Sequence, residues 1–236
     1  MMNNTLTKDD LNDYHKAGTC DIYGIDPYDL IKHKVMHYDY DHDANIISDF
    51  FTGYTGKFLV IGANDGLDQT FSLLENGWKG YYCEPNPISC AKLIENTKRF
   101  NDNVTIINSA ITPTSKITDF FISFDNSAYS SLDPTWLKNH GLSTQCKIIT
   151  NTIKFQDLLI TVGTDFDLII MDVEGIDIEL CQSINWDQFN RCKMLCLEAG
   201  PAVLKQVYQE GNFILTDQTP TNSFYKKIRY LNSFDE

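Results

Sequence analysis

Five short apolar runs recur from about residue 58 onward, separated by stretches with helical spacing. They cover residues 58–61, 80–83, 104–107, 167–171 and 194–197. Each run is too short for a core helix and is bounded by Gly, Asn or Asp, which favours a buried strand. Strands that alternate with helical crossovers are typical of a doubly wound, mostly parallel α/β sheet.

Helices are expected between these strands. The first carries Phe71 and Leu74 and stops at an Asn-Gly pair, and a third follows Gly175. The second is opened by two prolines after Glu84 and carries apolar side chains at helical spacing, namely Ile88, Ala91 and Ile94. Near the C-terminus, residues 213–216 and 223–228 flank a Thr-Pro-Thr-Asn turn, which predicts an antiparallel strand pair at one edge of the sheet.

The first part of the chain differs from the rest. Residues 1–54 contain a helix-start pattern and a segment dense in Tyr, His and Asp, so we expect an N-terminal helical extension before a catalytic domain at 55–236. The extension either covers the mouth of the active site as a lid or is a solvated appendage. His33 and His37 would share a helix face, but Lys34 stands where a zinc protease needs a glutamate, so at most a weak metal contact is expected there.

Composition narrows the possible functions. The 236 residues are 42% hydrophobic, enough for one α/β core, and the formal net charge of −13 disfavours binding to nucleic acid or to anionic membranes. We find no signal-like or membrane-spanning run, and the seven cysteines form no CxxC pair. These features predict a cytoplasmic protein with reduced thiols.

The most informative stretch is the turn that follows the first strand. Gly62 and Gly66 leave room for a ligand to approach the backbone, and Asn64 is the non-glycine residue that best tolerates a positive φ. Glu84 ends the second strand about 20 residues further on, the offset of an acid that binds ribose hydroxyls. A turn used only for packing is the alternative.

The spacing of the turn distinguishes between nucleotides. A dinucleotide fingerprint needs glycine at positions 64 and 67, where Asn64 and Leu67 stand, which argues against NAD and FAD. We find no phosphate-binding GxxxxGK[ST] loop. A ligand without a pyrophosphate, S-adenosylmethionine, fits this spacing better.

Taken together, the motifs resemble those of the FkbM family of S-adenosylmethionine-dependent methyltransferases. The matching residues are Ile61-Gly62-Ala63-Asn64-Asp65-Gly66, Glu84-Pro85-Asn86-Pro87, residues 126–132 (NSAYSSL), Asp172-Val173-Glu174-Gly175, Glu198 and Asn222-Ser223-Phe224-Tyr225. The resemblance implies the class I methyltransferase sheet, Rossmann-like, with seven strands of which the last is inserted antiparallel. It also implies methylation of hydroxyl groups on natural products and glycans.

Two positions depart from the family pattern. Val60 replaces an aspartate usual in the first strand, and Asp177 replaces a glutamate after the Asp-Val-Glu-Gly motif. Asp177 keeps the charge, whereas Val60 removes a hydrogen-bonding group that would shape the glycine turn.

Carboxylates that follow the fourth and fifth strands are the catalytic candidates. Ligands of open α/β sheets bind beyond the carboxyl ends of strands, so Asp172, Glu174 and Glu198 are expected to face the cofactor and acceptor. Each could instead cap a helix N-terminus, Glu174 above all. Asp172 is the first candidate for acceptor contact or general base, and His140 is a further candidate that could equally be an exposed surface residue.

The expected cofactor contacts include a second group of positions after the third strand, where Ser109 and Ala110 would border the adenine. The full set is Gly62, Ala63, Asn64, Asp65, Gly66, Glu84, Pro85, Ser109, Ala110 and Asp172. Tyr129, Ser130 and Ser131 either line the acceptor pocket or only make loop hydrogen bonds. A divalent ion could join Asp172 and Glu198, but the sequence supplies no clear third ligand, so no metal is assigned.

The leading hypothesis is an S-adenosylmethionine-dependent O-methyltransferase that acts on a small molecule or a carbohydrate. A nucleic-acid methyltransferase is disfavoured by the charge and because Asp172-Val173-Glu174-Gly175 replaces the Asn/Asp-Pro-Pro-aromatic motif of base-methylating enzymes. A non-catalytic module that only binds the cofactor is the alternative from another class, suggested by Val60.

Overall fold

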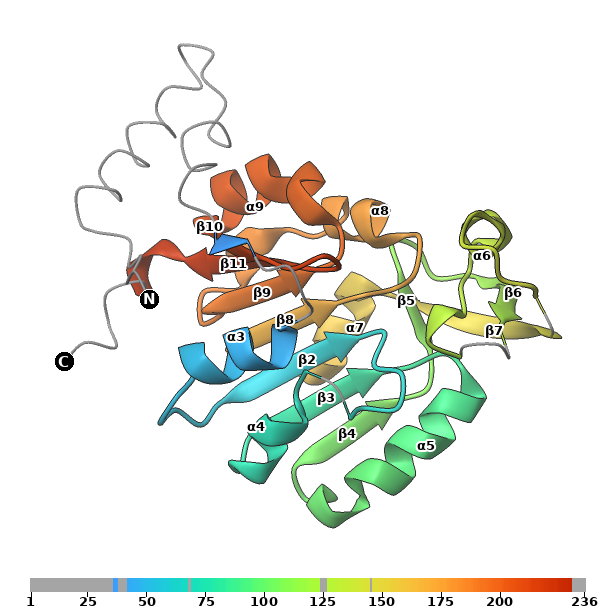
Figure 1. Cartoon of the computed structure of the whole chain (residues 1–236), viewed down its shortest axis with the longest axis horizontal. Helices are drawn as coiled ribbons and strands as arrows, with labels where there is room; N and C mark the ends of the chain where they lie inside the picture. Colours follow the sequence, from blue (N-terminus) through green and yellow to red (C-terminus); the bar gives the residue numbers. More distant parts are fainter. Residues whose placement is uncertain (1–35, 38–41, 68, 124–126, 145, 231–236) are drawn as a thin grey trace, which may run out of the picture.

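A central sheet of eight strands organises the protein (Figure 1). The computed structural model describes residues 36–37, 42–67, 69–123, 127–144 and 146–230. The strand order is β1-β10-β11-β9-β8-β2-β3-β4. Their bounds are β1 Met36–His37, β2 Lys57–Ile61, β3 Lys79–Cys83, β4 Val104–Ile107, β8 Leu168–Met171, β9 Met194–Leu197, β10 Phe213–Gln218 and β11 Ser223–Lys227.

The expected class I methyltransferase fold is confirmed by this topology. The five strands predicted as parallel, β4, β3, β2, β8 and β9, run parallel in that order, and β11 is inserted antiparallel between β9 and β10. The two-residue β1 adds to the outer side of β10 and runs parallel to it. The backbone of His37 therefore belongs to a strand, and the helix predicted through His33 and His37 is wrong at His37; His33 lies outside the described residues.

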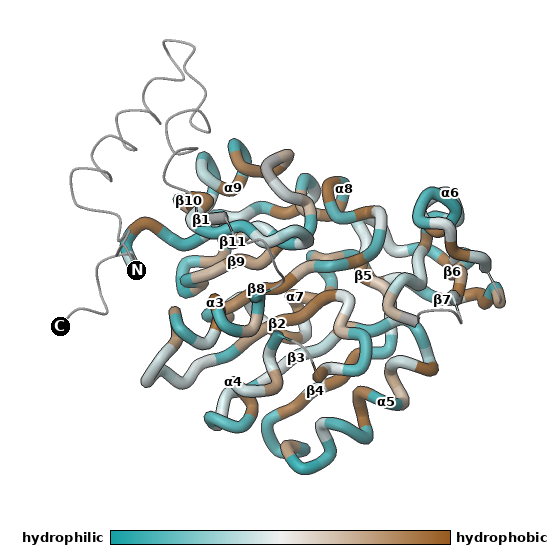
Figure 2. The backbone as a smooth tube through the Cα atoms, viewed as in Figure 1, coloured by the Kyte–Doolittle hydropathy of each residue, from teal (hydrophilic) through white to brown (hydrophobic). Residues whose placement is uncertain are grey.

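Helices cover both faces of the sheet. Side chains of β2 alternate, so that Leu59 and Ile61 pack toward α7, α8 and α9, whereas Phe58 and Val60 pack toward α3, α4 and α5. A parallel sheet buried on both faces needs apolar residues at successive positions, which Figure 2 shows along the central strands. The helices are α3 Asp43–Phe50, α4 Phe71–Glu75, α5 Pro87–Thr97, α7 Phe155–Val162, α8 Asp177–Gln182 and α9 Leu204–Gly211, with 3₁₀ turns η2 Lys98–Phe100, η4 Trp186–Gln188, η5 Gly200–Val203 and η6 Ile228–Tyr230.

Helix α5 packs through a different face from the predicted one. Ile88 and Ile94 are 43% and 55% exposed, and Ala91 is also exposed. The buried side of the helix is formed by Ser89, Cys90, Leu93 and Thr97. The prediction failed because the buried face combines Leu93 with the smaller Ser89, Cys90 and Thr97, whereas Ile88 and Ile94 lie on the exposed side.

A second, three-stranded sheet lies beside the carboxyl ends of the central strands, on the right in Figure 1. It contains β5 Ala110–Thr112, β6 Ile117–Ile122 and β7 Cys146–Lys154. The turn η3 Ser127–Tyr129 and helix α6 Pro134–Asn139 lie between β6 and β7 in the chain. The apolar pattern did not predict this sheet, since Ile117 and Ile149 are 73% and 75% exposed and so break the alternation expected of a half-buried strand.

The described cysteines are free thiols, and all but Cys146 are buried. Within the described ranges, none of the helices combines the length and the apolar character needed to cross a bilayer.

Candidate active site

A pocket opens at the carboxyl ends of β2, β3 and β8. Its walls include all the predicted cofactor residues except Asp65, namely Gly62, Ala63, Asn64, Gly66, Glu84, Pro85, Ser109, Ala110 and Asp172. The side chain of Asp65 accepts a hydrogen bond from Leu67 N at 3.3 Å, and its carbonyl accepts one from Asn96. The structure thus brings together positions up to 110 residues apart in sequence and leaves Asp65 outside the lining.

The glycine turn has the backbone conformation that its residues favour. Gly62, Asn64 and Gly66 all have positive φ angles, of 85°, 47° and 74°. The amides of Gly62 and Ala63 donate to the carbonyl of Cys83 at 3.0 and 3.1 Å, which ties the turn to the end of β3. This confirms the reason for an asparagine at position 64.

Glu84 and Asn64 meet directly. The Oε2 atom of Glu84 accepts a hydrogen bond from Asn64 N at 2.7 Å, and Oε1 accepts one from Asn86 N at 2.7 Å. Burial raises the pKa of Glu84 to about 7, against the opposing effect of the hydrogen bonds from Asn86 and Asn64. A carboxylate held at the end of β3 has free lone pairs for ligand hydroxyls, because each oxygen can accept more than one bond.

Val60 lines the same pocket and is buried. The turn beside it is held by backbone bonds to Cys83 and by the side chain of Glu84. The loop therefore keeps its shape with an apolar residue at position 60.

Other lining residues escaped the sequence analysis. Gln69 and Thr70 approach from the segment after the glycine turn, and Tyr82 comes from β3, where its hydroxyl lies 2.9 Å from Thr70 Oγ1. Phe120 comes from β6 of the unpredicted sheet. No spacing rule connects these positions, because they meet only through the packing of distant elements.

The serine-rich loop contributes one wall of the pocket. Ser130 lines it, together with Ala128 and Leu132, whereas Tyr129 and Ser131 lie outside the lining. Ser131 donates its hydroxyl to the carbonyl of Glu174, and this bond joins the loop to the carboxylate motif.

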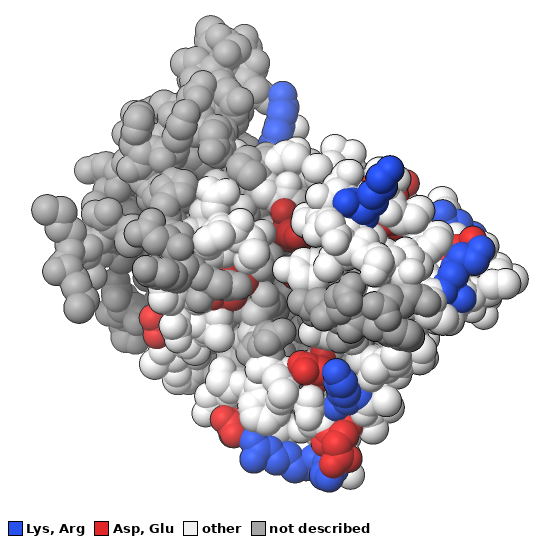
Figure 3. Space-filling model, turned by 45° about the vertical axis from the view of Figure 1, so that its right-hand side comes forward, with Lys and Arg blue, Asp and Glu red and all other residues white. Residues whose placement is uncertain are grey.

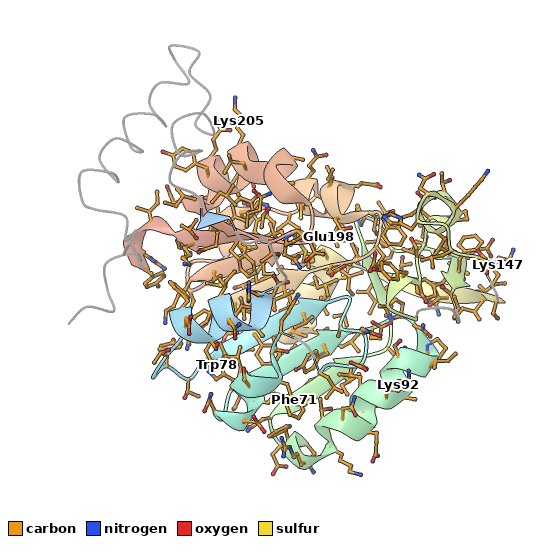
Figure 4. All side chains as sticks on the ribbon, in the orientation of Figure 1. Phe71, Trp78, Lys92, Lys147, Glu198 and Lys205 are labelled. Carbon is orange, nitrogen blue, oxygen red and sulfur yellow. The ribbon has the colours of Figure 1, made fainter. Side chains whose placement is uncertain are left out.

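Three carboxylates gather at the ends of β8 and β9. Asp172, Glu174 and Glu198 each place one oxygen within 4.8 Å of the others. Asp172 and Glu174 line the pocket, whereas Glu198, labelled near the centre of the molecule in Figure 4, does not. Asp177 organises the turn, since its carboxylate accepts bonds from Val173 N at 2.8 Å and Gly175 N at 3.1 Å. Asp177, which stands where the family usually has a glutamate, thus holds the backbone of the Asp172-Val173-Glu174-Gly175 motif.

The cluster retains protons. Burial, followed by the charges of Asp172 and Asp177, raises the pKa of Glu174 to about 9. Burial and the same neighbours raise the pKa of Glu198 to about 10. Burial and the charges of neighbouring carboxylates therefore favour the protonated forms of Glu174 and Glu198 at neutral pH.

An oxygen-only set of this kind could hold a hard divalent cation such as Mg²⁺, Mn²⁺ or Ca²⁺. Glu174 supplies the third ligand that the sequence did not reveal. Because two of the groups hold protons, a cation would bind with proton release.

His140 lies outside the pocket lining, after the end of α6. Its ring stacks on Trp136 with centroids 3.8 Å apart, and Trp136 stacks on Tyr129 at 5.6 Å. The imidazole is exposed. It is Trp136, and not His140, that packs against the Asp-Val-Glu-Gly motif, since a Cβ on Gly175 would lie 2.6 Å from the Trp136 ring.

We expect the retained protons to make folding stability depend on pH. A carboxyl whose pKa is raised on folding is protonated in the folded state and ionised in the unfolded state, so stability falls as pH rises from about 5 toward 9. Glu198→Gln mimics the protonated acid. At pH 8.5 it should raise the free energy of unfolding by about 1 kcal/mol after discounting for partial exposure, which corresponds to a rise in Tm of about 3 °C. At pH 5 it should change Tm little.

Thermal melts at the two pH values measure this difference. Glu179→Gln is the matched control, since Glu179 is exposed on α8. A shift of equal size at pH 5 and pH 8.5 would contradict the proton-sharing account.

Comparison with known families identifies the class of protein. The model of the methyltransferase FkbM domain matches residues 61–224, more than half of the chain. The chain therefore belongs to the FkbM methyltransferase family, and the family expected from its motifs is confirmed. The comparison with curated proteins gives no match.

Solved structures of other methyltransferases show distant likeness. A precorrin-6y C5,15-methyltransferase from Geobacter metallireducens is 11% identical, with a TM-score of 0.42 and coverage of 73% of this chain and 71% of that one. TrmK of M. capricolum, in complex with S-adenosyl-homocysteine, is 9% identical with a TM-score of 0.43, and the match covers 80% of this chain and 70% of that one. The ribosomal protein L11 methylase of Lactobacillus delbrueckii is 11% identical with a TM-score of 0.44, and the match covers 78% of this chain and 74% of that one. With TM-scores below 0.5, these likenesses carry no argument about the acceptor.

Proposed function

We propose that the chain binds S-adenosylmethionine in the pocket between β2, β3 and β8 and methylates a hydroxyl group of a small molecule or carbohydrate. The observation that carries the proposal is the direct contact between the glycine turn and Glu84, with Asp172 and Glu174 on the lining of the same pocket. These are the positions at which open α/β sheets bind ligands.

The residues fit a ligand with a sugar diol, an apolar ring and a charged tail. Glu84 offers carboxylate oxygens to the diol, Ser109 and Ala110 border the ring, and the backbone around Asn64 faces the tail. When bound, this cofactor supplies an activated methyl group. Since binding contacts alone need not accelerate chemistry, the rate should depend on how the chain aligns the acceptor.

The carboxylates locate the acceptor and its proton. A hydroxyl oxygen that forms a bond to the methyl carbon must lose its proton, and the electron pair of the broken carbon–sulfur bond stays on sulfur. Asp172 is our candidate for the group that receives this proton, because it lines the pocket and because burial and neighbouring carboxylates raise the pKa of Glu174 and of Glu198, which favours their protonated forms. The aromatic stack of Tyr129 and Trp136 lies next to the motif on the side of α6.

Surface charge supports a small acceptor. On the face in Figure 3, Lys and Arg side chains of the described residues are scattered and interspersed with Asp and Glu. A nucleic-acid substrate requires clustered positive charge, and the net charge of −13 opposes it.

The test is calorimetry with S-adenosylhomocysteine, followed by transfer of labelled methyl from S-adenosylmethionine to a panel of mono- and disaccharides, phenols and aliphatic alcohols. We expect saturable binding and a labelled ether product. Absence of binding to folded protein would refute the proposal, and binding without any transfer would favour a non-catalytic module.

A further inference from the structure

Helix α3 begins with a buried acidic side chain. Asp43 is 4% exposed, although carboxylates are rarely buried without partners. Its Oδ2 atom accepts bonds from Gln69 Nε2 at 2.9 Å and Asn222 Nδ2 at 2.6 Å, and Oδ1 accepts one from Thr219 Oγ1 at 2.9 Å. A buried charge is tolerated only when such bonds replace water, so these donors fix where Asp43 lies.

The partners of Asp43 come from separate parts of the fold. Thr219 and Asn222 form the turn between β10 and β11, where Thr219 N donates to Asn222 O at 2.9 Å. Gln69 follows the glycine turn and lines the pocket. Asp43 itself precedes residues 61–224, which match the family model. One carboxylate therefore joins the rim of the pocket to a helix outside the family domain.

The rim segment is attached at two points. Thr70 is held by the hydroxyl of Tyr82, which belongs to β3 inside the family domain. Gln69 is held by Asp43. The side-chain amide of glutamine has several rotatable bonds, and a charge-assisted hydrogen bond restricts it before a ligand arrives. Such preorganisation lowers the entropy that binding must overcome.

We propose that Asp43 is a positioning residue of the cofactor site and that α3 is energetically coupled to cofactor binding. The inference rests on the proposed function for the identity of the ligand. Asp43 acts through Gln69. By reciprocity, a ligand that orders the rim must also stabilise the attachment of α3.

Calorimetry with S-adenosylhomocysteine tests the first half of the proposal. Asp43→Asn removes the charge and replaces one of the two accepting oxygens by an amide group that cannot accept. We expect a dissociation constant about tenfold higher than that of wild type, the size of a lost charged hydrogen bond. Asp49→Asn is the matched control, because Asp49 is exposed on the same helix, and its affinity should be unchanged.

Hydrogen exchange tests the coupling with a readout that a merely structural role would not change. Gln69→Leu keeps the bonds of Asp43 to Thr219 and Asn222. It removes the link from Asp43 to the rim and also replaces an amide of the pocket lining with an apolar group. S-adenosylhomocysteine should slow amide exchange in residues 43–50 of the wild type and of Asp49→Asn, but not of Gln69→Leu. If Asp43→Asn does not fold, the exchange measurement on Gln69→Leu carries the test, because it reports protection of α3 and not affinity alone.

Two results would overturn the proposal: wild-type affinity in Gln69→Leu, or ligand-induced protection of α3 that persists in it. Failure of the wild type to bind S-adenosylhomocysteine would instead overturn the proposed function, so the two failures are distinguishable.

Discussion

Gly62→Ala is expected to abolish ligand binding and to lower the free energy of unfolding by more than about 3 kcal/mol, since it combines backbone strain with overpacking. Gly62 has a φ of 85°, and a Cβ at this position would lie 1.6 Å from the carbonyl oxygen of Asp172. That oxygen belongs to the backbone at the end of β8, so no rotamer change can relieve the clash. The ends of β2 and β8 would have to separate, and the pocket lies between them.

Gly53→Ala separates the two causes. Gly53 has a φ of 72°, but a Cβ there would meet nothing within 4 Å. This control carries the cost of the left-handed conformation alone, about 1–2 kcal/mol. Denaturant unfolding and S-adenosylhomocysteine calorimetry measure the difference between the two variants. Equal losses of unfolding free energy in both would contradict a steric clash between position 62 and the Asp172 carbonyl.

The middle of the central sheet was predictable because β2, β8 and β9 are buried on both faces. Such strands read as continuous apolar runs with sharp boundaries, and Leu168–Met171 and Met194–Leu197 match the predicted runs to within a residue. The second sheet was not predictable, since Ile117 and Ile149 expose large apolar side chains. In α5 the buried face is chosen by fit against the sheet, which hydropathy alone does not report.

The cofactor end of the pocket follows from local rules, whereas its other walls depend on tertiary contacts. The positive φ of Asn64 and the meeting of that residue with Glu84 follow from a strand–turn–helix unit and from the adjacency of β2 and β3. Gln69 acquires its role only through Asp43 and the turn at Asn222, 179 residues from Asp43 in sequence. The proton content of Glu174 and Glu198 likewise depends on burial and neighbouring charges that no spacing rule predicts.

Asp172→Asn should lower the rate of methyl transfer about 100- to 1,000-fold, the contribution typical of a general base. The variant keeps the shape of the side chain, and the backbone amide of residue 172 still donates to Ile61 O at 3.0 Å, so the pocket should remain intact. Affinity for S-adenosylhomocysteine should therefore stay within about threefold of wild type, because the lost group acts on the acceptor proton.

Glu198→Gln supplies the contrast within the same cluster. Glu198 is not part of the pocket lining, and burial raises its pKa to about 10, which favours the protonated form. Its amide variant should therefore lose about tenfold at most in the rate of transfer, less than a base contributes. Single-turnover transfer of labelled methyl to the best acceptor of the panel measures both variants. If Asp172→Asn instead weakened cofactor binding and left single-turnover transfer at saturation unchanged, Asp172 would be a cofactor contact and the proton would leave by another route. Because burial and neighbouring charges raise the pKa of Glu174 and of Glu198, we expect the loss in Asp172→Asn to appear in the transfer step and not in cofactor binding.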